Sequence, residues 1–281
     1  MKRSMVLLVV GGALAAPTIL AVQLAFAILG IGVVGMVHGA GDLAVVAKPR
    51  RPAFLAAYGL VSLVTLFWWI EQPAVALPAF LVASAFHFGV EDAPGGPLSE
   101  RFARGITLIL APATLHDAGY ADLLRLAGGS ASSLSAFTPL AAIAGGLGGA
   151  LLLFLAWHRR DTRLALGVAA LILLPPLIGF TIGFLVLHAL PQTLERRDRL
   201  GCASTTIYLK TVAPIFGAAI LLAGAVAGLL LHFDPSGVRG LFAGIAALAV
   251  PHLLVTPWFE ARTASSQLRD QSKSHLYRVA F

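Results

Sequence analysis

Histidines at the ends of apolar runs are the residues of this chain whose type and spacing could do chemistry. His38 closes one run in His-Gly-Ala-Gly-Asp, His87 closes another in His-Phe-Gly-Val-Glu-Asp, and His188 closes a third. His252 lies inside the last apolar run, directly after a proline. A lone histidine on an apolar helix is usually structural, but ionisable side chains at membrane depth are costly and usually serve function. Four such residues predict a functional site.

Carboxylates accompany two of these histidines at helical spacing. Asp42 is four residues after His38. Glu91 is four residues after His87, and Asp92 comes next. On a continuing helix each carboxylate could reach its own histidine or a neighbouring one. Imidazole is a ligand for iron, zinc and copper, and a metal-bound histidine commonly donates its second N–H to a carboxylate. The pattern therefore indicates an intramembrane metal site, with a loop or cap role as the alternative for the two aspartates.

The other histidines are weaker candidates. His158 and His275 have basic, polar neighbours. His232 ends an apolar run beside Asp234. We expect these three to be solvated. His116 ends a run at the membrane face opposite the first four histidines, under the topology given below, which makes it a poorer ligand.

The elements that must hold these histidines are apolar helices. Hydrophobic types make up 58% of the 281 residues and charged types 12%, with a mean hydropathy of +0.87, whereas a soluble domain carries about a quarter charged residues. The apolar stretches are continuous, which favours helices over the alternating strands of a barrel. We therefore predict an all-α, polytopic membrane bundle of about eight to ten segments. The glycine-rich run 145–149 favours close helix approach.

We expect one membrane domain over residues 1–259 and a basic, polar tail over 260–281. The net charge of +7 fits basic membrane loops, and no basic face with aromatic readers points to nucleic acid. The single cysteine, Cys202, excludes an intrachain disulfide and a cysteine metal cluster. The basic N-terminus resembles a signal peptide, but its apolar run continues to Val37, which favours a first span.

Two apolar runs need a break. Residues 5–37 contain Pro17, and residues 163–190 contain Pro175-Pro176, and we expect an interruption at each. With those breaks all the basic loops share one side, which the positive-inside rule identifies as cytoplasmic. The same topology brings the first four histidines toward that side. We therefore expect a multi-pass protein of the cell membrane, with basic loops and histidine site toward the cytoplasmic face.

Taken in chain order, these elements resemble the Brp/Blh family of membrane β-carotene 15,15′-dioxygenases. The motifs that carry the resemblance are His38-Gly39…Asp42, His87-Phe88-Gly89…Asp92, Pro112…His116, His188 and Pro251-His252. Each is weak alone, but five in this order span nearly the whole chain. The resemblance implies an Fe2+-dependent enzyme that splits the central double bond of β-carotene with O2 to give retinal. Its partners would be a carotenoid from the bilayer, O2 and membrane lipid, with no nucleic acid.

The resemblance also implies roles for single residues. The catalytic residues and metal ligands would be His38, His87 and His188, with His252 as a further metal ligand. The residues that support these ligands would be Asp42, Glu91, Asp92 and Gln192. Three phenylalanines could line a path for the polyene, with ordinary helix packing as the alternative: Phe86, Phe88 and Phe184.

One position departs from the family pattern. Four residues after His188, where the family has a second histidine, this chain has Gln192, a poor iron ligand beside imidazole. Either His252 completes the ligands, or the iron keeps one more open position, or the chain no longer cleaves and binds a carotenoid, retinoid or other isoprenoid. A membrane transporter is the rival from another class, because the Pro175-Pro176 break fits the broken helices of transporters.

Overall fold

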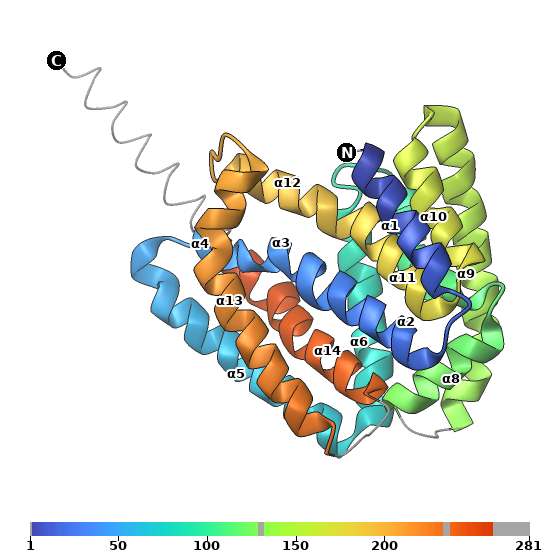
Figure 1. Cartoon of the computed structure of the whole chain (residues 1–281), viewed down its shortest axis with the longest axis horizontal. Helices are drawn as coiled ribbons and strands as arrows, with labels where there is room; N and C mark the ends of the chain where they lie inside the picture. Colours follow the sequence, from blue (N-terminus) through green and yellow to red (C-terminus); the bar gives the residue numbers. More distant parts are fainter. Residues whose placement is uncertain (1, 129–131, 233–236, 261–281) are drawn as a thin grey trace.

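Helices account for all the regular structure in the residues that the structure describes, which are 2–128, 132–232 and 237–260. The structure is a computed structural model (Figure 1). The α-helices are α1 (Lys2–Ala15), α2 (Leu20–Ala27), α3 (Met36–Ala40), α4 (Asp42–Val45), α5 (Arg51–Glu71), α6 (Pro73–Glu91), α7 (Leu98–Leu110), α8 (Asp117–Gly128), α9 (Ser132–Arg159), α10 (Thr162–Leu173), α11 (Pro176–Phe184), α12 (Leu190–Arg199), α13 (Thr205–Leu230) and α14 (Val238–Leu254). Two π-helical turns, η1 (Ile28–Gly35) and η4 (Leu185–Ala189), and two 3-10 turns, η2 (Lys48–Arg50) and η3 (Ala111–Ala113), join them.

Seven helical stretches within the described ranges are long and apolar enough to cross a membrane. They are Leu20–Val45, Lys48–Glu71, Pro73–Glu91, Phe137–Arg159, Pro176–Arg199, Thr205–Leu229 and Val238–Glu260. The prediction of an all-α, polytopic membrane bundle is confirmed. The predicted eight to ten segments also include three shorter apolar helices, which fall outside these seven. They are α1, α7 and α10, with only 14, 13 and 12 residues. Helices of that length rise roughly 18–21 Å, short of a core about 30 Å thick.

Both predicted proline breaks are present. α1 ends at Ala15, just before Pro17, and α2 begins at Leu20. α10 ends at Leu173 and α11 begins at Pro176. Proline lacks a backbone N–H and disfavours helical geometry in the residue before it, so a helix ends more readily there than within an unbroken apolar run.

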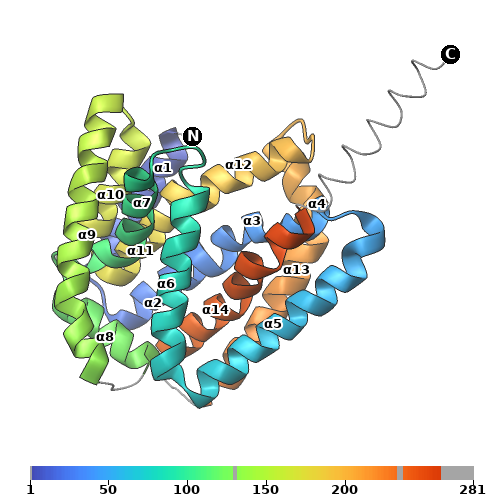
Figure 2. The ribbon, with the colours of Figure 1, turned by 180° about the vertical axis from the view of Figure 1, so that it is seen from behind.

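The break before α11 produces the central helix of the bundle. α11 runs without interruption through η4 into α12, and it packs against α10, α2 and α1. Nearly all of its side chains are buried. Seen from behind, α14 lies between α5 and α6 (Figure 2). Together α11 and α14 bring residues from the middle and the end of the chain to one place.

Glycines allow the helices around α7 to approach closely. A Cβ on Gly105 of α7 would lie 1.9 Å from the backbone carbonyl oxygen of Ala85 on α6. A Cβ on Gly145 of α9 would lie 2.4 Å from the backbone of Leu110. The predicted close approach of the glycine-rich run on α9 is therefore confirmed, and α6 and α7 form a second crossing that only glycine fits.

The α6–α7 crossing gives a test of packing. We expect Gly105→Ala to lower the melting temperature of the protein in detergent micelles, because the new methyl group collides with backbone that cannot move alone. Gly59→Ala on α5 is the matched control, since no atom lies within 4 Å of a Cβ there. Alanine is favoured over glycine inside a helix by about 1 kcal/mol, so the control should melt at the same temperature or higher. Equal melting temperatures for both variants would contradict this account of the crossing.

Candidate metal centre

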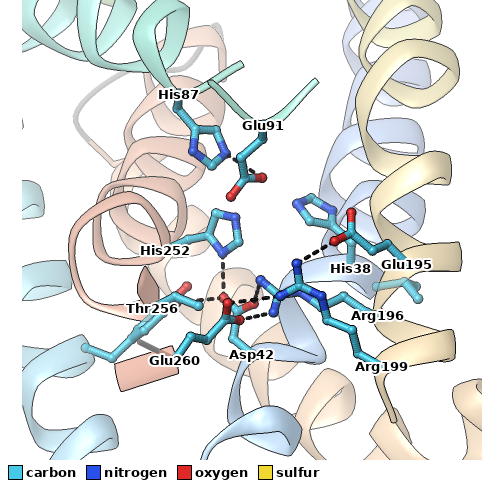
Figure 3. Close-up of polar contacts among 12 residues, drawn as sticks. His38, Asp42, His87, Glu91, Glu195, Arg196, Arg199, His252, Thr256 and Glu260 are labelled. Atoms are coloured by element: carbon cyan, nitrogen blue, oxygen red, sulfur yellow. Dashed lines mark hydrogen bonds and ion pairs between the residues drawn. The ribbon is translucent and has the colours of Figure 1, made fainter. Parts of the chain in front are cut away.

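Four histidine rings from four separate elements meet in the interior of the bundle. His38 comes from α3, His87 from α6, His188 from η4 and His252 from α14. Going round the group, the ring centroids are 5.1 Å apart from His38 to His188, 5.4 Å from His188 to His87, 5.2 Å from His87 to His252 and 5.5 Å from His252 back to His38. All four are buried, and Figure 3 shows three of them turned toward a common space. We call this group the histidine cluster.

Two members of the cluster are placed by π-helical turns. His188 lies within η4, and His38 is the third residue after η1. A π turn widens the helix by one residue and is frequent at functional sites. The backbone carbonyl of Gly35, the last residue of η1, accepts a hydrogen bond from Nδ1 of His38. Neither turn can be predicted from the sequence, since an apolar run has the same pattern with or without the extra residue.

Three of the rings are held at Nδ1, which leaves Nε2 for the cluster. Besides the bond from His38 to the backbone, His188 Nδ1 lies 2.8 Å from Asp92 Oδ1, and His252 Nδ1 lies 2.5 Å from Asp42 Oδ2. A proton donated from Nδ1 places the ring lone pair on Nε2, as in metal-bound histidines. The buried Nε2 of His252 has no hydrogen-bond partner in the part of the chain that the structure describes. An unused nitrogen among neighbouring imidazoles fits a transition-metal ion.

Asp42 anchors His252 rather than the histidine that precedes it on the chain. Its Oδ2 also accepts a hydrogen bond from the hydroxyl of Thr256 at 3.0 Å, and its Oδ1 faces Arg196 Nη2 at 3.3 Å. The helix from His38 is interrupted before Asp42, because α3 ends at Ala40 and α4 begins at Asp42. The spacing rule therefore identified a carboxylate of the site but not its partner.

Asp92 and Glu91 contact different histidines although they are adjacent. Asp92, just after the end of α6, reaches across to His188. Burial raises the pKa of the Asp92 carboxyl to about 8, opposed by two nearby arginines. Glu91 stays with the histidine one turn before it, and its Oε2 lies 3.4 Å from Nε2 of His87. The two residues thus approach the cluster from different sides.

An ion-pair network adjoins the cluster at Asp42 (Figure 3). Arg196 of α12 is only 5% exposed and pairs with both Asp42 and Glu260. Arg199 pairs with Glu260 and with Glu195, which extends the network toward the surface. From the sequence Arg196 is one of the basic loop residues and Glu260 belongs to the tail, whereas in the structure both side chains contact the bundle. Residues 261–281 lie outside the described residues. The feature that could have singled out Arg196 is its position on α12, the helix that continues from η4 and its His188.

The other histidines lie apart from the cluster. His116 is half-buried, and its Nε2 lies 3.2 Å from a carbonyl oxygen at the end of α10. His158 and His232 are exposed. His275 lies outside the described residues. His158 and His232 thus have the solvated surroundings expected from the sequence.

Two of the three predicted aromatic residues border the cluster. The ring centroids of Phe88 and Phe184 lie 4.6 and 5.5 Å from that of His188. Phe86 is 76% exposed, because α6 turns by about 200° between residues 86 and 88, and its side chain does not face the cluster. Gln192 is buried in the first turn of α12.

Comparisons with known proteins point to one family for this chain. The model of a family described as β-carotene 15,15′-dioxygenase matches residues 29–260, a range that contains the whole cluster. A β-carotene 15,15′-dioxygenase from an uncultured marine bacterium, 66A03, is 24% identical over 263 residues, which cover 84% of this chain and 93% of the relative. No solved structure matches the chain.

The ion-pair network predicts unequal effects of two arginines on stability. Arg196→Met leaves two carboxylates without their shared cation inside the bundle, and we expect a loss of about 3–5 kcal/mol in unfolding free energy. Arg199→Met removes a side chain that is 51% exposed, for which about 0–1 kcal/mol is expected. Thermal unfolding of both variants in the same micelles measures the difference. A loss for Arg196→Met as small as that for Arg199→Met would show that the network contributes little.

Proposed function

This chain belongs to the β-carotene 15,15′-dioxygenase family, and we propose that it cleaves the central double bond of β-carotene, or of a similar carotenoid, to give retinal. One carotenoid and one O2 would yield two aldehydes, each half taking one oxygen atom. The observation that supports the proposal most directly is the histidine cluster, four buried imidazoles within the range that the family model matches. Ionisable groups at membrane depth rarely lack a function.

The metal that we propose for the site is Fe2+. His38, His87, His188 and His252 would hold it, and their Nδ1 contacts with Asp42, Asp92 and the backbone would fix the ring orientations. Iron is among the metals that imidazole suits. When bound, it would supply the activation of O2 that a carbon–carbon double bond needs for cleavage.

The protein's own apolar side chains would bind and orient the polyene. Phe88 and Phe184 present aromatic surface beside His188. A carotenoid dissolves in the bilayer, so a site enclosed by membrane helices can receive it laterally, without passage through water. The burial of the cluster would also exclude bulk water from the reacting bond.

We propose that the protein lies in the cell membrane with the cluster toward the cytoplasmic face. In Figure 1 the N-terminus, the connection from α9 to α10, and α12 lie toward one edge of the bundle. α8 and the connection from α5 to α6 lie toward the opposite edge. The basic residues of the first set are Lys2, Arg3, Arg160, Arg196, Arg197 and Arg199, whereas the second set carries Arg125. The positive-inside rule assigns the more basic side to the cytoplasm.

A homologue that binds a carotenoid or retinoid without cleaving it is the second candidate. The observation in its favour is Gln192, which stands where the resemblance has a histidine. Its amide is a neutral donor group and a poor ligand for iron. Iron content and cleavage products together separate the two candidates.

The first test of function is retinal formation in a bacterial host that accumulates β-carotene. We expect the intact chain to consume β-carotene and produce retinal, measured by chromatography. His38→Ala, His87→Ala and His188→Ala should each abolish retinal and bound iron while the protein still inserts, because each removes a ligand nitrogen. His116→Ala is the matched control and should keep activity. Unchanged β-carotene in cells with well-inserted protein would favour the non-cleaving candidate, and an active variant among the three would exclude that histidine as a ligand.

The role of position 192 has its own test. We expect Gln192→His to raise the iron occupancy or the rate of cleavage, since an imidazole one helical turn after His188 adds a stronger donor. Iron content is measured on the purified variant beside the unmodified chain. An unchanged iron content would indicate that His252 already fills the site or that residue 192 does not face it.

A further inference from the structure

We propose that Glu91 is a metal ligand, so that the site binds its ion through imidazoles together with one carboxylate. This inference rests on the proposed function for the presence of a metal. It differs from the sequence-based expectation, in which Glu91 would only support a histidine from behind.

The positions of the donor atoms carry the inference. One ligand atom each from His87, Glu91 and His188 can be chosen so that all three lie within 4.8 Å of one another. Ligands about 2.0–2.2 Å from one ion lie at most about 4.4 Å apart, so a small closure of the three side chains around an ion suffices. Figure 3 shows the Glu91 carboxylate turned toward His87 and His252, into the space that the cluster encloses.

Glu91 also approaches its histidine on a different nitrogen from the two aspartates. Asp42 and Asp92 bind at Nδ1, on the outer side of the rings, at hydrogen-bonding distance. Glu91 faces Nε2 of His87 at 3.4 Å, beyond the 2.7–3.2 Å that is usual for an N–H···O bond. Two ligand atoms that each lie about 2.0–2.2 Å from one ion can be 3.4 Å apart, so the separation fits an ion bound by both atoms.

Charge gives a second argument. The Glu91 side chain is 26% exposed and lies at the end of a membrane-spanning helix, where a carboxylate needs a partner or a metal. Arg196 neutralises Asp42 on the far side of the cluster, whereas the ion-pair contact of Glu91 among the described residues is the long one with His87. Imidazoles joined by a carboxylate are a donor set that suits Fe2+ in oxygen chemistry.

The test uses Co2+ as the probe, because its visible absorption responds to the atoms bound to it. The full chain in micelles is titrated with Co2+, and Glu91→Gln is compared with Glu71→Gln, an exposed carboxylate at the end of α5. Glutamine keeps the size and the hydrogen-bond acceptor of glutamate but is a weak ligand. We expect Glu91→Gln to lower Co2+ affinity by more than about 100-fold, beyond the ~10–100-fold typical of a residue that only supports a ligand, and to shift the absorption of any Co2+ still bound. Glu71→Gln should change neither.

An unchanged absorption of bound Co2+ in Glu91→Gln would overturn the inference, whatever its affinity. If Glu91→Gln does not fold, Glu91→His is measured in its place. An imidazole that binds the ion at this position should retain Co2+ and shift its absorption. An absorption equal to that of the unmodified chain would overturn the inference. The absorption does not depend on carotenoid turnover. Co2+ bound through Glu91 without retinal formation would therefore reject the proposed function alone, and retinal formation with an unshifted spectrum would reject the role of Glu91 alone.

Discussion

Burial of four imidazoles inside apolar helices is the constraint on which the rest of the structure depends. An ionisable group at this depth is tolerated only with a partner, and each partner comes from the backbone or from a carboxylate. Asp42 joins α4 to His252 of α14, and Asp92 joins the end of α6 to His188 of η4. Because the Asp42 carboxylate is itself charged, it in turn requires Arg196. The polar contacts therefore determine which helices must meet at the centre of the bundle.

The backbone permits that meeting by departing from regular helices at a few points. The break at Pro175-Pro176 turns one long apolar run into α10 and the buried helix α11. The π turns η1 and η4 set the direction of the side chains that follow them or lie within them. Gly105 lets α6 and α7 cross at backbone contact, which places α6 and its histidine against the centre. Each departure is local, and together they bring four distant segments to one cluster.

The resulting site combines a polar centre with apolar walls, which suits a reaction between O2 and a hydrocarbon dissolved in the bilayer. Phe88 and Phe184 contact the same ring that Asp92 orients, so aromatic surface and a carboxylate meet at His188. On the opposite side of the cluster the ion-pair network of Arg196 ties α12 to Asp42 and Glu260. Any metal held here would be enclosed on one side by charge and on the other by aromatic rings.

The fold class, both proline breaks, the family and the identity of the four clustered histidines could be predicted from the amino-acid order, because hydropathy, proline chemistry and rare ionisable residues in apolar runs are local signals. The sequence did not determine the partner of Asp42, since helical spacing points to His38 only if α3 continues into α4. It did not single out Arg196, because a buried arginine and a loop arginine look alike along a chain. Only the tertiary structure decided these pairings and the direction in which Glu91 points. The distances that matter there join residues far apart in sequence, and a small register change such as a π turn redirects every side chain beyond it.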